Sequence, residues 1–249
     1  MISNIYILIS KELLNIKKFI LQYILVLFLF PFLLFLFLAI PFSRVFLDFK
    51  PIYTIWVCSG ILFVSILFNI YLLNLNWSIK LYDNSFIKSL PILSLEYLLS
   101  QIIYSLIIGL FQFIISAIVL NSLSIGFMTF MQFIKCFVIL LPGIIIMANY
   151  SSIIAHLVKN NFIINALNCL LFLFVSFSMG SFIPLNLYPI EYFNIVSYFP
   201  FSGTLINIQK IISYESVLFS MFFISIFYSL IFSFINYYII ESKMKSYNE

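Results

Sequence analysis

Six long apolar stretches constrain this chain more than any other feature of its sequence. They cover residues 19–40, 53–75, 97–120, 128–154, 162–183 and 217–240. Each is long enough for a helix to cross a bilayer, which takes roughly 20 apolar residues. Helices are the expected spanning form, because every backbone hydrogen bond then closes within its own segment. We therefore predict an all-α integral membrane protein with six transmembrane helices.

Composition supports a lipid environment and a single membrane domain over residues 1–249. Only 8% of the residues are charged and 64% are hydrophobic, whereas a soluble chain carries about 25% charged residues. The net charge of +4 is too small and too scattered for nucleic-acid binding. The three cysteines, Cys58, Cys136 and Cys169, lie far apart in apolar stretches. They suggest neither a disulfide framework nor a metal site, and no cofactor is expected.

The placement of basic residues predicts the orientation in the membrane. On one side of the predicted spans lie eight lysines: Lys11, Lys17, Lys18, Lys80, Lys88, Lys159, Lys243 and Lys245. The other side holds only Arg44, Lys50, Lys135 and Lys210. Cytoplasmic loops are enriched in Lys and Arg, so both termini are expected in the cytoplasm. We expect the chain in the plasma (inner) membrane of a bacterium.

Two segments outside the spans have helical patterns of their own. Residues 1–18 place Ile5, Leu8, Ile9, Leu13 and Ile16 on one stripe, which is typical of an amphipathic helix lying along a membrane surface. The segment 184–216 is apolar but interrupted by proline and charge, which excludes an unbroken lipid-facing helix. We predict two short re-entrant helices there, over residues 190–198 and 202–213.

Catalytic and ion-coupling groups are scarce. The glycines form no phosphate-binding loop, so the chain is not expected to bind and hydrolyse ATP by itself. No carboxylate lies in the middle of a predicted span, as an ion-coupled carrier would be expected to have. The single histidine, His156, has no partners for catalysis or metal binding nearby in the sequence. We predict that the protein is not an enzyme.

Several uncharged polar side chains do fall inside the predicted spans. Those that could line a path for a polar substrate are Gln112, Asn149, Asn165 and Asn168. Asn165 and Asn168 are three positions apart and share one helix face. The alternative is that these amides only hold helices together by hydrogen bonds.

The segment 76–96 is the most polar loop between spans. Within "LYDNSFIKSLPILSLEYLLSQ" (81–101), Ile79, Tyr82 and Phe86 can share one face of a short helix that Pro91 ends. Exposed aromatic residues on such a helix suggest a docking site for another protein. A helix that rests on lipid headgroups is the alternative.

In four features, taken in order, the chain resembles permeases of the type-2 family of ATP-binding-cassette transporters. They are "SKELLNIKKFILQYILVLFLFPFLLFLF", "LYDNSFIKSLPILSLEYLLSQII", "GSFIPLNLYPIEYFNIVSYFPFSG" and one closing span with a short tail. The loop of this family commonly has Glu and Gly where this chain has Asp83 and Asn84.

The resemblance implies an exporter in which two permease chains, identical or paralogous, form the path and a separate cytosolic ATPase drives it. It assigns the ATPase-coupling element to Tyr82, Asp83, Phe86 and Lys88. It assigns the interface helix to a second set of residues: Lys11, Glu12, Lys17 and Lys18. Family substrates include drugs, peptides, polysaccharides and lipid-linked glycans. An ion-driven carrier or channel, or a membrane enzyme or assembly subunit, are the alternatives.

Overall fold

The computed structural model describes residues 2–83, 92–124, 126–158 and 160–245, and all regular structure within them is helical. Five helices are long and apolar enough to cross a membrane. The first is continuous over Ile20–Ser43, built from α2 (Ile20–Leu34), a π-helical turn η1 (Phe35–Ala39) and α3 (Ile40–Ser43). The other four are α4 (Tyr53–Asp83), α6 (Ser94–Leu123), α7 (Phe130–Leu157) and α11 (Phe219–Lys245). The chain is thus an all-α, multi-pass membrane protein.

The remaining predicted span is shorter than expected. Residues 162–183 were predicted to be helical throughout, but α8 (Asn161–Leu173) and the π-helical turn η2 (Phe174–Ser178) end at Ser178. The apolar helix over Phe162–Ser178 is therefore shorter than the roughly 20 residues of a full span. Gly180, with φ +85°, takes a left-handed backbone conformation that favours glycine and follows directly after the helix end.

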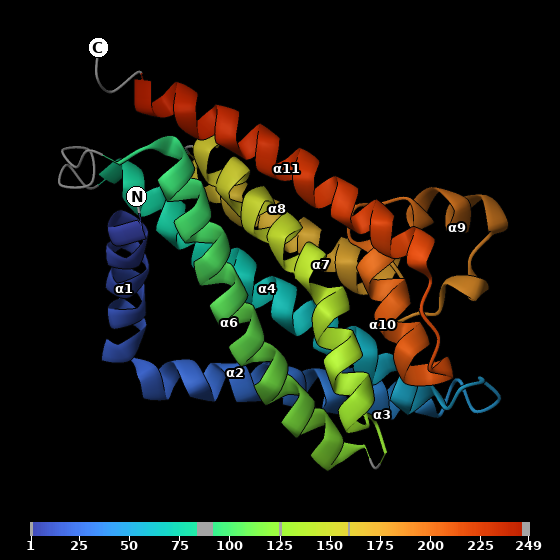
Figure 1. Cartoon of the computed structure of the whole chain (residues 1–249). Helices are drawn as coiled ribbons and strands as arrows, with labels where there is room; N and C mark the ends of the chain where they lie inside the picture. The colour runs from blue at the N-terminus through green and yellow to red at the C-terminus, as the bar shows by residue number, and fades with distance from the viewer. Residues whose placement is uncertain (1, 84–91, 125, 159, 246–249) are drawn as a thin grey trace.

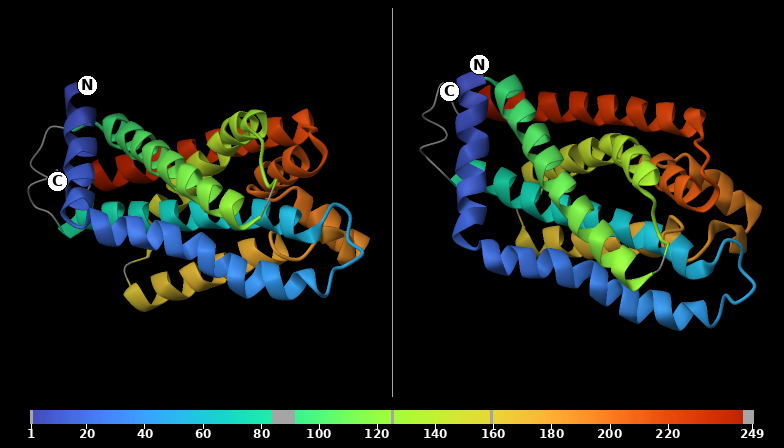
Figure 2. Two further views of the ribbon diagram at one scale, coloured as in Figure 1. Left: turned by 90° about the horizontal axis from the view of Figure 1, so that it is seen from below. Right: turned by 60° about the horizontal axis from the view of Figure 1, so that its bottom comes forward.

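The helices run side by side between two ends of the molecule, and both termini lie at the same end (Figure 1). Helix α1 (Ile2–Lys18) lies across that end, and the chain turns sharply from it into α2. The opposite end carries α3, the short helix α9 (Ile190–Ser197) and α10 (Ser202–Tyr214). Helix α8 projects from the side of the bundle, as the two further views show (Figure 2).

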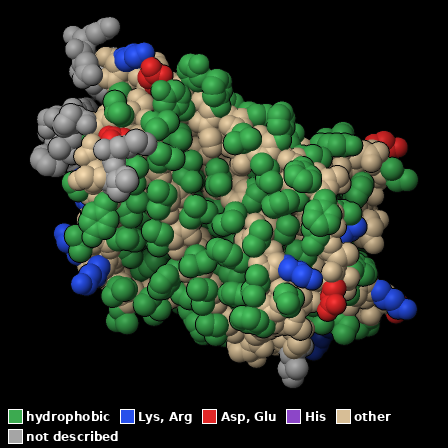
Figure 3. Space-filling view, viewed as in Figure 1, with side chains coloured by type: hydrophobic (Ala, Val, Ile, Leu, Met, Phe, Trp, Pro, Cys, Tyr) green, Lys and Arg blue, Asp and Glu red, His purple; other side chains and the backbone are tan. Residues whose placement is uncertain are grey.

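The molecular surface matches this arrangement. Hydrophobic side chains cover the broad middle of the face in Figure 3, and the charged ones gather towards the two ends. Many of the most exposed apolar residues belong to the outer faces of the first spanning helix and of α11, for example Leu21, Phe37, Phe223 and Phe234. An apolar band of this kind is stable only against lipid or against another apolar surface.

Side chains of the following segment explain how η2 can end inside the bundle. Three carbonyl oxygens in its last turn accept hydrogen bonds from side-chain hydroxyls. The donors are Ser181 to Val175 O (2.7 Å), Tyr188 to Phe177 O (3.2 Å) and Tyr192 to Ser178 O (2.9 Å). Unpaired carbonyls at this depth would each cost several kcal/mol, roughly, in a lipid environment. The segment after η2 therefore satisfies the helix end that the apolar pattern alone did not reveal.

The two short helices predicted for the outer segment are confirmed in position. Residues 190–198 and 202–213 correspond to α9 and α10. Helix α10 is packed inside the protein, with Leu205, Ile208 and Ile211 fully buried. Its carbonyl ends are also satisfied, since the Gln132 side chain of α7 donates to Ile211 O (3.2 Å). Gln209 in turn donates to Gly180 O (2.8 Å), which joins α10 to the turn after η2.

Small residues allow these elements to approach closely. A Cβ at Gly60 of α4 would lie 1.9 Å from Ser181 O, and one at Gly203 of α10 would lie 2.5 Å from Met221 O of α11. Helices in membranes commonly pack closely at small residues, because lipid supplies no hydrophobic driving force and van der Waals contact between the helices must hold them together.

Candidate functional site

The end of the bundle that carries both termini holds the predicted interface helix. The apolar stripe of α1 is confirmed, but it packs on protein instead of facing a membrane surface. Leu8 and Ile9 are buried in a cluster with Trp77 of α4 and with Tyr97 and Tyr104 of α6. Helix α1 is thereby attached to the ends of two of the long helices.

The four charged residues predicted for the interface helix have different environments. Lys17 and Lys18 are exposed and Lys11 is half-buried. Glu12 was placed on a polar face, but it is buried and lines a cavity of about 190 Å³ with Asn15, Tyr23 and other residues. The cavity lies inside the corner between α1 and α2, where a buried carboxylate is shielded from solvent. A corner between these helices is expected where a surface helix leads into a span, and it accounts for that burial together with Leu73 and Tyr104, which also line the cavity.

Glu96 fastens the start of α1 to the start of α6. Its Oε2 accepts from Asn4 Nδ2 (3.0 Å) and from the Leu93 backbone N–H (3.1 Å), and the side chain is buried. No role was predicted for Glu96 from the sequence. Its capping role was readable from the sequence, because a glutamate at the third position of a helix often accepts a hydrogen bond from the backbone N–H of the residue just before the helix. Its contact with Asn4 depends on the tertiary fold.

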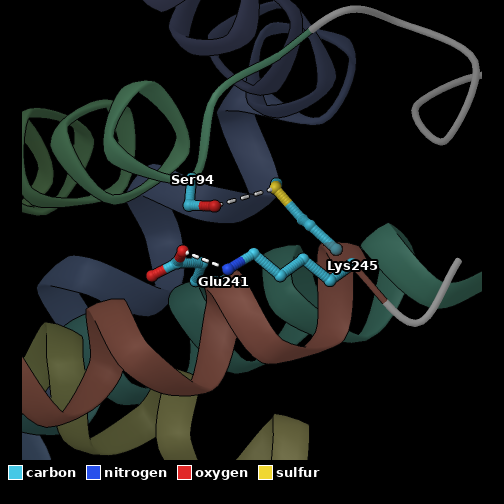
Figure 4. A network of polar contacts seen from close by, with 4 residues as sticks. Ser94, Glu241 and Lys245 are labelled. Carbon is cyan, nitrogen blue, oxygen red and sulfur yellow. Dashed lines mark hydrogen bonds and ion pairs between the residues drawn. The ribbon is translucent and has the colours of Figure 1, made fainter. Parts of the chain in front are cut away.

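The last turn of α11 lies beside this junction (Figure 4). The Ser94 hydroxyl donates to Met244 Sδ (3.5 Å), and Lys245 Nζ lies 2.7 Å from Glu241 Oε1. Because Lys245 is largely exposed, this ion pair adds little stability. The first turn of α6 is therefore contacted by α1 on one side and by α11 on another.

Of the predicted coupling residues, only the backbone of two can be placed. Residues 76–83 were predicted to open a loop, yet α4 continues through Tyr82 to Asp83. No helix-breaking residue precedes Asn84, and Trp77 is buried against α6, which extends the helix. The side chains of Tyr82 and Asp83, and all of Phe86 and Lys88, lie outside the described residues.

A buried polar network joins four helices further into the bundle. Asn236 of α11 donates to Asn149 Oδ1 of α7 (2.8 Å) and, at 3.5 Å, to Gln101 Oε1 of α6. Gln101 donates to Ala148 O (3.2 Å). On α4, Asn74 donates to the Ser105 hydroxyl of α6 (2.7 Å). Only Asn149 of these amides was among the predicted path residues, and here it binds neighbouring helices.

Gln112 has a well-defined structural role. Its Nε2 donates to Leu27 O of α2 (3.2 Å) and to the Ser116 hydroxyl (2.8 Å). Leu27 O lies four residues before Pro31, which has no N–H to complete the helical hydrogen bond. Gln112 therefore supplies the donor that the proline removes.

Asn165 and Asn168 lie on α8, away from the other predicted path residues. Asn165 is exposed and Asn168 is half-buried, with no hydrogen-bond partner for its Oδ1 among the described residues. Cys169 beside them is also exposed. The four predicted path residues are thus not brought together within one chain. The exposed face of α8, which carries the Asn165 amide, is left to meet either lipid or a second chain.

No cluster of three or more metal-binding side chains occurs in the described part of the chain. His156 is buried on α7, where its Nδ1 lies 2.6 Å from Ser152 O. Lys135, near the start of α7, is exposed, as expected for a side chain that reaches towards the bilayer surface. Both positions are explained by packing and by the membrane boundary, without a catalytic role.

Comparison of the sequence with models of known protein families finds no match, and comparison with curated proteins finds none either.

Proposed function

We propose that this chain is the membrane permease subunit of an ATP-binding-cassette exporter of the type-2 kind, driven by a separate cytosolic ATPase. The observation that carries the proposal is α1, a helix lying across the termini end whose apolar stripe packs on α4 and α6. Its exposed Lys17 and Lys18 point to a charged or polar neighbour outside the membrane. A cytosolic partner that moves α1 would move the ends of the long helices with it.

The polar segment that follows α4 supports the same proposal. Helix α4 ends and α6 begins at this end of the bundle, and the sequence that joins them contains Phe86 and Lys88. A docked ATPase would then touch both α1 and this segment. The charge distribution favours the cytoplasm for this end, and so a bacterial plasma membrane with both termini inside.

The face of α8 supports a second permease chain. Exposed amides at membrane depth are unfavourable against lipid, and they commonly form hydrogen bonds between helices. Where two chains face each other, Asn165 and Asn168 would form hydrogen bonds with the same residues of the second chain or line the substrate path. On this proposal the α8 segment crosses or enters the membrane as a sixth span. The substrate class stays open among drugs, peptides, polysaccharides and lipid-linked glycans.

The deciding experiment places a photocrosslinking amino acid at Phe86 in native membranes and identifies the captured protein by mass spectrometry. We expect a soluble ATPase with a phosphate-binding loop, and no ATP hydrolysis by the purified chain alone. The same probe at Phe223, on the outer face of α11, is the control and should capture lipid. Capture of lipid alone from position 86 would contradict the proposal.

The second chain has its own test, which uses the native thiol on α8. A short bifunctional maleimide should link two chains through Cys169, and Cys169→Ser should abolish the dimer band. Cys58 and Cys136 are buried and need no replacement. A chain that stays monomeric at every reagent length would argue for the alternative, a self-contained ion-driven carrier or channel.

A further inference from the structure

A cavity of about 690 Å³ opens on the side of the bundle where α8 projects. Its walls come from α7, from α8 with η2, from the turn between α9 and α10, and from α11. The lining includes Tyr150, Leu167, Phe177, Ser178, Phe201 and Phe232. Its volume falls within the range of about 300–1,000 Å³ that is usual for small-molecule sites.

The walls of this cavity are almost entirely hydrocarbon. Among the described residues that line it, none is charged and only Tyr150 and Ser178 have polar side chains. The nearby carbonyls of Phe177 and Ser178 are occupied by the hydroxyls of Tyr188 and Tyr192, so they do not present bare acceptors. A charged or strongly polar ligand would lose its hydration here without compensation. The cavity therefore selects an apolar occupant.

The two hydroxyls add a limited polar contribution. Neither the Tyr150 nor the Ser178 hydroxyl has a hydrogen-bond partner among the described residues. Each can donate to an oxygen acceptor such as an ester carbonyl. The chemistry thus favours a molecule with a long hydrocarbon part and a few oxygen atoms.

The length of one cavity wall suits a single chain of that kind. At about 1.5 Å per residue, the wall from Leu167 to Ser178 is roughly 16 Å long. Half of a bilayer's hydrocarbon core is about 15 Å thick. Leu170 and Leu173 of the same wall are exposed at the rim, which leaves the cavity open towards lipid.

We propose that this cavity binds one acyl chain of a membrane phospholipid. The π-helical turn η2 forms part of its wall, and such turns occur frequently at functional sites. The bound chain fills the space between α8 and α11, which have few other contacts with each other. The site requires only that the protein lies in a bilayer, so it holds whether or not the chain is an exporter.

The test is native mass spectrometry of the full chain after extraction from membranes into detergent. We expect one phospholipid to stay bound to each wild-type chain. Leu167→Trp adds bulk to the cavity and should lower the retained fraction about tenfold. Leu230→Trp places the same side chain on the exposed face of α11 and should leave retention unchanged. Equal retention in the two variants would overturn the proposal.

A second measurement uses the wild-type chain and does not depend on the folding of either variant. The chain is placed in nanodiscs with phosphatidylethanolamine that carries a diazirine midway along one acyl chain, and adducts are mapped after illumination. We expect adducts on the cavity residues at about tenfold the frequency per residue seen at Phe223 and Phe227. Adducts spread evenly over exposed residues would mean annular lipid only, and would refute a bound chain. If the cavity residues gave no adducts because a second copy of the chain covers them, the proposal would also be refuted.

Discussion

At the scale of single residues, most of the buried polar side chains satisfy the backbone or each other. Gln112 occupies the carbonyl that Pro31 leaves without a donor, and Gln132 and Gln209 do the same for α10 and the turn after η2. Such side chains explain why a chain so rich in apolar residues retains amides in its interior. Their energetic effect should be modest, because hydrogen bonds between membrane helices average about 0.6 kcal/mol.

The pair formed by Gln112 and Pro31 gives a first prediction. Gln112→Leu should lower the free energy of unfolding by about 1 kcal/mol, because it leaves Leu27 O buried without a donor. In a Pro31→Ala background the helix regains its own N–H, and the same substitution should cost much less. Unfolding in mixed detergent micelles measures all four proteins of this cycle. An identical cost in both backgrounds would mean that Gln112 serves another purpose.

The network around Asn236 gives a second prediction. Asn236→Leu removes the donors to Asn149 and Gln101 together, so we expect a loss of about 1 kcal/mol in the free energy of unfolding. Asn165→Leu is the matched control, since that amide is exposed on α8 and its loss should be neutral in the monomer. The two variants are compared by the same unfolding assay. A neutral Asn236→Leu would show that the network does not stabilise the bundle.

At the scale of secondary-structure elements, the helices differ in how firmly they are held. Helix α10 is enclosed by α4, α7 and α11, whereas α8 packs through few residues and α1 is attached at one end of the bundle. Glu96 contributes to the attachment of α1 through Asn4 and Leu93. Hydrogen bonds to a charged group contribute about 1.5–3 kcal/mol, more than those between neutral groups.

A third prediction follows for α1. Glu96→Ala should release the start of this helix, and hydrogen–deuterium exchange of its amides should become at least about tenfold faster. The buried contacts of Leu8 and Ile9 remain, so the rest of the bundle should keep its protection. Glu241→Ala removes a half-buried carboxylate whose ion pair with Lys245 lies within α11, and it serves as the control. Unchanged exchange in α1 would mean that its apolar stripe alone holds it.

At the scale of the whole molecule, the two ends of the bundle have different structures. One end carries both termini and α1, and the other carries α9, α10 and the connection after α3. Charged side chains gather near both ends and leave an apolar band between them. From the distribution of lysines we predict that both termini face the cytoplasm.

A fourth prediction tests this orientation in intact cells. With Cys169 replaced by serine, a cysteine at Ile195 should react with a membrane-impermeant maleimide, because that side chain on α9 is exposed at the end away from the termini. A cysteine at Lys17 should react only after the cells are permeabilised. The reverse pattern would place both termini outside.

Much of the fold follows from local sequence patterns. Long apolar runs predicted five long helices. The spacing of Leu8 and Ile9 predicted the apolar stripe of α1, though not its burial against protein, and Pro189 and Pro200 separated α9 from its neighbours. These features are readable because hydrophobic periodicity and the missing N–H of proline act within a few residues. The end of α8 at Ser178 could not be read in this way, since its carbonyls are satisfied by Tyr188 and Tyr192 further along the chain.

The sequence by itself determined that this protein lies in a membrane as a bundle of helices, because its apolar runs leave no soluble alternative. Only the tertiary structure decided what its polar residues do. Asn4 meets Glu96, 92 positions away, and Asn149 meets Asn236, 87 positions away. No local pattern links such pairs. Partners for buried amides and carboxylates are chosen by which helix faces come together, and that choice depends on the packing of the whole chain.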